Sequence, residues 1–256
     1  MPDKKIKMII QYDGTDYSGW QKQKKEKTVQ GVIEEKLSCI VNTEIKIRGA
    51  GRTDAGVHAL EQIAVFNSEI KMPINKLHQA LNALLPKDIR IIGMDEVEDN
   101  FHPQYSAMKK SYIYFICLDD YVSCFLQRYV WNYPRKLYFN LMEDALDLFK
   151  GKKDFSALSG ATDVKNKIRT IFDISMEVYS ELSFLDIKFN GNFLKIRVEA
   201  DGFLKNMARN IVGCLIEIGS KRLTKEEIAH FIEKKQRPNP LTTAPPNGLF
   251  LEKIFY

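Results

Sequence analysis

Residues 45–66 read Ile-Lys-Ile-Arg-Gly-Ala-Gly-Arg-Thr-Asp-Ala-Gly-Val-His-Ala-Leu-Glu-Gln-Ile-Ala-Val-Phe, two apolar runs around a loop of very small residues. The runs 45–48 and 58–66 predict a short strand and its return strand. Between them, Asp54 is the lone carboxylate of a loop rich in glycine and alanine. Because glycine permits close approaches that other residues block, a large molecule could reach this carboxylate. An Asp that only caps its own turn would also fit this composition.

The segments around this loop predict a ferredoxin-like unit. Residues 5–12 alternate apolar and polar side chains, which is typical of a half-buried strand. Thr28 is placed to cap a helix over 29–40, and Pro73 to begin a second helix that Pro86 ends. Residues 89–97 then predict a fourth strand. The resulting order of strand, helix, strand, strand, helix, strand is that of the ferredoxin-like fold.

After residues 101–107 the pattern begins again. Capping signatures predict two helices, one from Asn140 with Glu143 and a shorter one from Thr224 with Glu227. Asn190-Gly191 predicts a hairpin turn between two strands. The remaining predicted elements are strands over 111–118, 170–179, 185–189, 193–198 and 249–256, and a long helix over 203–218.

We therefore predict an α+β fold of two ferredoxin-like, or RRM-like, βαββαβ halves. They form a mostly antiparallel sheet with helices on one face and a central active-site cleft. The predicted division is an N-terminal half over 1–104 that carries the Asp54 loop, and a C-terminal half over 105–256 that closes the cleft.

Composition favours a globular protein of the cytoplasm. The chain has 256 residues, 45% of them apolar and 28% charged, with no apolar run long enough to cross a membrane. The first residues lack the apolar core of a signal peptide. The four cysteines and four histidines are scattered, so we expect free thiols and no metal. Motifs for a cofactor are missing too, and none is expected.

The net charge of +5 is only mildly basic, so its distribution says more than its total. Basic residues cluster in several short stretches: Lys22, Lys24, Lys25 and Lys27, then Lys109-Lys110, Lys152-Lys153, Lys165 to Arg169, and Lys234 to Arg237. Such clusters could follow a phosphate backbone, although lysine runs are more often a solvated face.

The nonapeptide Gly51-Arg-Thr-Asp-Ala-Gly-Val-His-Ala59 resembles the active-site signature of the tRNA pseudouridine synthase A family, with Asp54 at the catalytic position. The early motifs Tyr-Asp-Gly-Thr over 12–15, Gly-Trp-Gln over 19–21 and Thr-Val-Gln over 28–30 resemble the same family. Residues 244–249 resemble the closing motif of the family, and looser matches lie at 155–157 and 167–171.

The resemblance implies roles for four further residues. Tyr112 would stack on the target base, as aromatic side chains commonly do with unpaired RNA bases, whereas Tyr114 is left to the core. Arg209 would pair with Asp54, keeping the carboxylate ionised and oriented. Arg52 would fill the space that the target base vacates, and Leu249 would line the pocket beside the base. From the residues alone, Tyr112 could equally be a core side chain, and Arg209 could extend to water.

We also predict RNA contacts for basic side chains along the chain, namely Lys22, Lys24, Lys25, Lys110 and Arg169. Some positions depart from the family pattern. Gln104 stands where the family usually has arginine, and Glu61 and Val65 replace a usual glycine and histidine. The loss of a cation at Gln104 bears on which uridines are selected rather than on catalysis.

The resemblance implies a homodimeric enzyme that isomerises uridine to pseudouridine in the anticodon stem-loop of tRNA, without cofactor or membrane. Asp54 would act either as a nucleophile at C1′ or as a base toward the sugar, and the base that removes the C5 proton is not identified. Three alternatives stay open: a paralogous synthase acting on other RNA positions, a non-catalytic RNA-binding pair of RRM-like repeats, and a glycoside hydrolase. The last usually needs two acids, and no second acid stands out.

Overall fold

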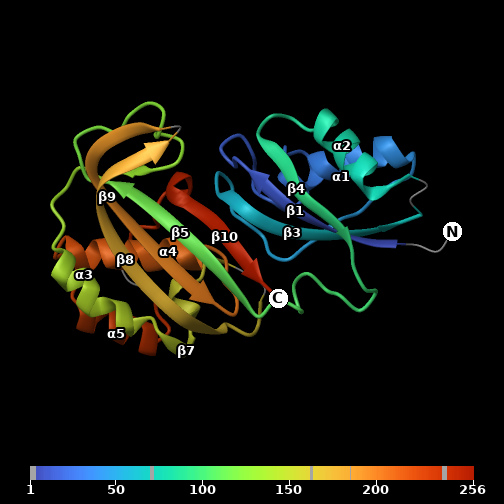
Figure 1. Cartoon of the computed structure of the whole chain (residues 1–256). Helices are drawn as coiled ribbons and strands as arrows, with labels where there is room; N and C mark the ends of the chain where they lie inside the picture. The colour runs from blue at the N-terminus through green and yellow to red at the C-terminus, as the bar shows by residue number, and fades with distance from the viewer. Residues whose placement is uncertain (1–3, 70–71, 162–163, 185, 238–240) are drawn as a thin grey trace. The chain divides into compact units, whose positions relative to one another are not determined.

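The computed structural model describes residues 4–69, 72–161, 164–184, 186–237 and 241–256 (Figure 1). The chain divides into two compact units, the first made of Met1–Met108 with Phe250–Tyr256 and the second of Lys109–Leu249. Their strands are mostly antiparallel, and the described residues include five α-helices. The predicted α+β class is confirmed. The roles predicted for the halves 1–104 and 105–256 stay a prediction.

The first unit has the predicted ferredoxin-like order. Its elements are β1 (Lys4–Tyr12), α1 (Val29–Val41), β2 (Arg48–Gly49), β3 (His58–Ser68), α2 (Ile74–Leu84), β4 (Ile89–Glu96) and most of β10 (Leu249–Phe255). Strand β1 lies between β3 and β4, antiparallel to both, and β2 pairs with β3. On the other side, β10 runs parallel to β3.

Strand β2 is shorter than predicted because α1 binds the residues before it. Ile47 donates its N–H to the Glu34 carboxylate over 3.0 Å, and its carbonyl accepts from the Gln30 side chain over 3.0 Å. With both main-chain groups bound to helix side chains, Ile47 does not join the sheet. Ladder pairing begins only at Arg48.

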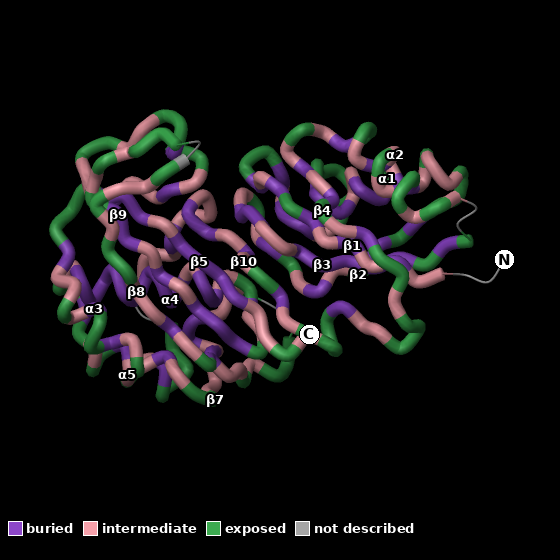
Figure 2. The backbone as a smooth tube through the Cα atoms, viewed as in Figure 1, coloured by how far each residue is buried: buried purple, intermediate pink, exposed green. Residues whose placement is uncertain are grey.

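The core of the first unit lies between one face of its sheet and the two helices. Ile6, Met8 and Ile10 are fully buried at alternate positions of β1. Figure 2 colours the backbone by burial and shows buried stretches along the strands of the sheet. The helices contribute their apolar stripes, with Val29, Ile33 and Leu37 from α1 and Leu77 and Leu81 from α2. Thr28 caps α1 as predicted, because its side chain accepts from the Gly31 N–H.

The second unit is larger and carries insertions. Its elements are β5 (Lys109–Cys117), β6 (Trp131–Asn132), α3 (Phe139–Ala145), β7 (Gly151–Asp154), β8 (Ile168–Phe184), β9 (Ile187–Ala200), α4 (Met207–Gly219) and α5 (Lys225–Glu233), with short 3-10 turns at Leu146–Leu148, Ser156–Leu158 and Pro246–Gly248. Its strands lie in the order β5-β9-β8-β7, with β6 beside β5. Nearly every residue of α4 is buried, so this helix forms the centre of the unit's core.

The predicted turn at Asn190-Gly191 is wrong. Both residues lie inside β9, where Asn190 pairs with Glu181 of β8. The Asp119 carboxylate lies beside this part of β9, where it accepts hydrogen bonds from the backbone and side chain of Asn192. A Cβ at Gly191 would lie 2.5 Å from that carboxylate, so the glycine serves a close approach. Residue 185, the first of the predicted 185–189 strand, lies outside the described residues.

Two predicted helix starts are also wrong. Helix α3 begins after Tyr138 with no side-chain cap, so the predicted Asn140–Glu143 signature is not used. Helix α4 begins at Met207, four residues later than predicted, after Asn206 in the left-handed conformation. The capping box at Thr224 and Glu227 is confirmed. Among the described residues, no helix is long and apolar enough to cross a membrane.

Candidate active site

The Asp54 loop connects β2 to β3 in the first unit and is bound to the segment that follows β1. Thr53 accepts the Trp20 N–H over 3.1 Å, and Gly56 donates to the Tyr17 carbonyl over 3.2 Å. Within the loop, the Asp54 carbonyl accepts from the Val57 N–H over 3.2 Å. The backbone on either side of Asp54 is thereby held, while the residue itself is only half-buried.

Glycines of the early segment allow this contact. A Cβ at Gly14 would overlap the carbonyl oxygen of Val57. Gly19 has φ of +90°, and a Cβ there would lie 2.7 Å from the Thr53 carbonyl oxygen. The motif Tyr-Asp-Gly-Thr with Gly-Trp-Gln is therefore a backbone support for the Asp54 loop, because side chains would hold the two segments apart.

Buried polar contacts complete this support. The Tyr12 and Thr53 hydroxyls lie 2.8 Å apart, and Gln62 donates to the Gly51 carbonyl over 3.0 Å. His58 is 1% exposed; its Nδ1 accepts the Gly14 N–H over 3.1 Å, and its ring stacks on Phe250 at 4.6 Å. These contacts fix the residues before and after Asp54 in a small rigid frame.

The predicted basic contacts of the first unit differ in their surroundings. Arg52, Lys24 and Lys25 are exposed. Lys22 instead forms a 2.9 Å ion pair with Glu34, whose side chain is 4% exposed. Hydrogen bonding to this carboxylate raises the pKa of Lys22. Lys22 therefore has a structural partner in addition to its predicted role.

In the second unit, Tyr112 and Tyr114 lie on the same face of β5. Tyr112 is 8% exposed and meets Phe203 edge-to-face, with ring centroids 4.7 Å apart. A tyrosine packed in this way is held in one orientation, which is what a stacking surface for a base requires.

Arg209 lies half-buried on the apolar helix α4. Its Nε donates to the Ala244 carbonyl over 2.6 Å, and its own carbonyl accepts the Ala244 N–H over 3.2 Å. Both main-chain groups of Ala244 are thus bound to Arg209. The contact directs the guanidinium and links α4 to the segment that leads to Leu249.

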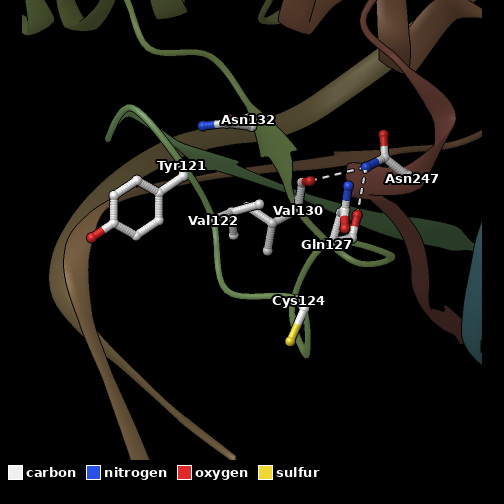
Figure 3. A pocket seen from close by; sticks show the side chains of 7 residues that line it. All are labelled: Tyr121, Val122, Cys124, Gln127, Val130, Asn132 and Asn247. Atoms are coloured by element: carbon white, nitrogen blue, oxygen red, sulfur yellow. Dashed lines mark hydrogen bonds between the residues drawn. The ribbon is translucent and has the colours of Figure 1, made fainter.

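Residues 241–249, called here the closing segment, end at Leu249, which is 4% exposed. The Asn247 amide donates to the Val130 carbonyl over 2.9 Å and to the Gln127 carbonyl over 3.2 Å (Figure 3). Beside these contacts is a pocket of about 330 Å³, lined by Tyr121, Val122, Cys124, Gln127, Val130, Asn132 and Asn247. Asn247 therefore anchors the closing segment to the loop after β5.

Two predicted RNA contacts of the second unit are neighbours. Burial, reinforced by the charge of Arg169, lowers the pKa of Lys110 to about 8. Arg169 donates to the Asn166 and Ile168 carbonyls and lies against Gly202, next to Phe203. The cations therefore adjoin the aromatic pair of Tyr112 and Phe203. Gln104, in the first unit, is exposed and donates its N–H to His102.

The predicted residues of each unit fall into local groups. In the first, Arg52 and Asp54 share one loop; in the second, Arg209 is joined to the segment of Leu249, and Tyr112 lies near Lys110 and Arg169. Sequence reasoning missed Tyr114 and Asn247, which hold the closing segment. The Tyr-x-Tyr spacing was a signal for Tyr114. The sequence pattern of a buried tyrosine is the same, however, whether or not its hydroxyl makes a hydrogen bond. No group of three or more metal-ligating side chains exists among the described residues.

Residues 8–106 and 145–256 match the family model described as tRNA pseudouridine synthase. The chain belongs to this family.

Curated relatives match nearly from end to end. The chain is 59% identical to tRNA pseudouridine synthase A of Thermodesulfovibrio yellowstonii over 98% of this chain and 99% of the relative. It is 40% identical to tRNA pseudouridine synthase A 1 of Protochlamydia amoebophila, covering 98% and 95%, and 38% identical to tRNA pseudouridine synthase A of a Thermoanaerobacter species, covering 98% and 99%. The roles of individual residues stay predictions.

Proposed function

We propose that this chain isomerises uridine to pseudouridine in the anticodon stem-loop of tRNA, with Asp54 as the catalytic carboxylate. The observation that carries the proposal is the signature loop around Asp54 in a chain that matches tRNA pseudouridine synthases along nearly its whole length. The support of that loop by the early segment agrees with a need to hold one carboxylate in place.

The reaction breaks the N1–C1′ bond of uridine, turns the uracil, and joins C1′ to C5. The C5 proton is lost and N1 gains a proton, so the change is an isomerisation that consumes no donor. In the proposal Asp54 acts first, as nucleophile at C1′ or as base toward the sugar. Both routes need the ionised carboxylate, which is the state that a nearby guanidinium favours.

The other predicted residues assist this step. Arg209 would pair with Asp54, Tyr112 would stack on the uracil, Leu249 would line the pocket, and Arg52 would fill the position left by the extruded base. The packing of Tyr112 against Phe203 and the bonds between Arg209 and Ala244 support these assignments, because each holds a side chain in one orientation. Lys22, Lys24, Lys25, Lys110 and Arg169 would contact the RNA backbone.

We further propose that the enzyme is a homodimer, as the resemblance implies, and that it works in the cytoplasm, as its composition favours. Gel filtration with light scattering tests the dimer, since a monomer mass at micromolar concentration would contradict it.

The function is tested with unmodified tRNA transcripts and the variant Asp54→Ala. After incubation, carbodiimide treatment and primer extension map pseudouridine at each position. We expect modification in the anticodon stem-loop by the wild type, and a rate at least about a thousandfold lower for Asp54→Ala with RNA affinity retained. No product with any tRNA would refute the synthase. Product at other positions would indicate a paralogue, and full activity of Asp54→Ala would refute the assigned residue.

A further inference from the structure

The closing segment crosses α4 and is held there by polar side chains. Its hydrogen bonds with that helix include those from the Thr242 N–H to Glu217 over 3.3 Å, from the Thr243 hydroxyl to Asn210 over 2.8 Å, and from Arg209 to the Ala244 carbonyl over 2.6 Å. A Cβ at Gly213 would overlap the Thr242 carbonyl, so the segment lies directly on the helix backbone. Each of the residues 242–244 therefore has its own hydrogen bond to α4.

Tyr114 of β5 holds the next residue. Its hydroxyl donates to the Pro245 carbonyl over 2.7 Å, and its side chain is 1% exposed. Two carbons of its ring lie 2.7 Å from where a Cβ of Gly248 would be. The closing segment therefore lies close against the Tyr114 side chain, which binds Pro245 through its hydroxyl and leaves no room for a side chain at position 248.

The bonds made by Tyr114 and Arg209 are coupled through the chain. Arg209 binds the Ala244 carbonyl, and Tyr114 binds the carbonyl of the following residue. Pro245 has φ of −55°, which its ring keeps near that value, so one of the two backbone torsions that separate the two carbonyls is fixed. Burial raises the pKa of Tyr114 well above its ordinary value, and the positive charge of Arg209 acts in the opposite direction.

We propose that Tyr114 is a positioning residue for the isomerisation: by holding the Pro245 carbonyl it directs the Arg209 guanidinium, through Ala244, and fixes the start of β10 at Leu249. The inference rests on the proposed function, in which Arg209 pairs with Asp54 and Leu249 lines the uracil pocket. Tyr114 touches neither substrate nor Asp54 in this role. It differs from an ordinary core tyrosine because its hydroxyl, rather than its ring alone, carries the effect.

The first test is Tyr114→Phe, which keeps the ring and removes the hydroxyl. Misplacing Arg209 and Leu249 by a fraction of an ångström should lower kcat about tenfold while KM stays within about twofold. The matched control is Tyr138→Phe in the same unit. This variant also loses a hydroxyl but keeps the ring, whose centroid lies 3.8 Å from the Lys221 Nζ. All rates are measured well below the melting temperature of each variant. An unchanged kcat for Tyr114→Phe would overturn the inference.

A double-mutant cycle separates positioning from simple loss of stability. In the wild-type background, Tyr114→Phe is expected to lower the rate about tenfold. If Tyr114 acts through Arg209, the same substitution in the Arg209→Lys variant should lower the single-turnover rate by less than about threefold. Fully multiplicative effects would show that the hydroxyl acts independently of Arg209 and would contradict the inference. A wild type that forms no pseudouridine would refute the proposed function itself, which is a different outcome.

Discussion

The Asp54 loop of the first unit and the closing segment of the second are both irregular stretches that lead into a strand, yet different contacts dominate in each. Around Asp54, the closest contacts join backbone groups that meet where side chains are absent, at Gly14 and Gly19, and buried side chains complete the support. The closing segment is held by side chains that reach its main chain, among them Tyr114, Arg209 and Glu217.

This difference indicates how each region responds to mutation. Where two backbone segments touch at a glycine, no side chain can move aside, so a methyl group added to that glycine must displace the whole loop. A support made of hydrogen bonds can lose one contact and keep the others, so its losses should be graded. The following predictions test that contrast.

The largest effect is expected at Gly14→Ala, where the new Cβ would overlap the Val57 carbonyl oxygen. We expect a loss of about 3 kcal/mol in the free energy of unfolding, measured in urea, together with lost activity. The control is Gly93→Ala, whose Cβ would meet side-chain rather than backbone atoms, the nearest being Cδ1 of Ile9 at 3.0 Å. Equal losses for the two variants would show that the backbone contact is not special.

A smaller effect is expected at Glu217→Gln in the other region. Glu217 is 1% exposed; burial raises the pKa of its carboxyl, but hydrogen bonds from Arg222 and Thr242 together outweigh this and lower it below the ordinary value. We expect a loss of about 2 kcal/mol at pH 7, measured by urea unfolding.

The pH dependence of that loss follows from the sign of the shift. Because the folded carboxyl has the lower pKa, its contribution is complete above the unfolded value of 4.5 and disappears as pH falls through the folded value. Wild type and Glu217→Gln should therefore converge in stability as pH falls below 4.5 and through the lower folded pKa of this carboxyl. The exposed Glu143→Gln serves as control and should match the wild type throughout. A difference for Glu217→Gln that did not shrink in acid would contradict the ionised contact.

The smallest effect is expected at Lys110. Burial and the charge of Arg169 lower its pKa to about 8, so its charge, and any phosphate contact it makes, should weaken as pH rises from 7 to 9. We expect tRNA affinity, measured by filter binding, to fall about threefold more for the wild type than for Lys110→Arg, which stays charged. The exposed Lys24→Arg is the control, with the wild-type pH dependence. Identical curves for all three proteins would remove Lys110 from the RNA contacts.

Local signals in the sequence predicted the parts of the fold that depend on neighbours in the chain. Thr28 and Thr224 cap their helices as predicted, because a cap needs only residues three positions away. The prediction failed at Asn190-Gly191, where the glycine accommodates Asp119 from a distant part of the chain. It was incomplete at Tyr114, whose burial was expected but whose bond to Pro245 was not.

The sequence by itself determined the family, the βαββαβ order of the first unit, and the position of Asp54 in a loop of small residues. These follow from periodicity, capping and a contiguous motif, which are properties of adjacent residues. Only the tertiary structure decided what the small residues are for: Gly14, Gly19 and Gly248 admit segments 34 to 134 positions away in the sequence. Such contacts depend on the path of the folded backbone, so no local pattern specifies them, and they determine how firmly the predicted site residues are held.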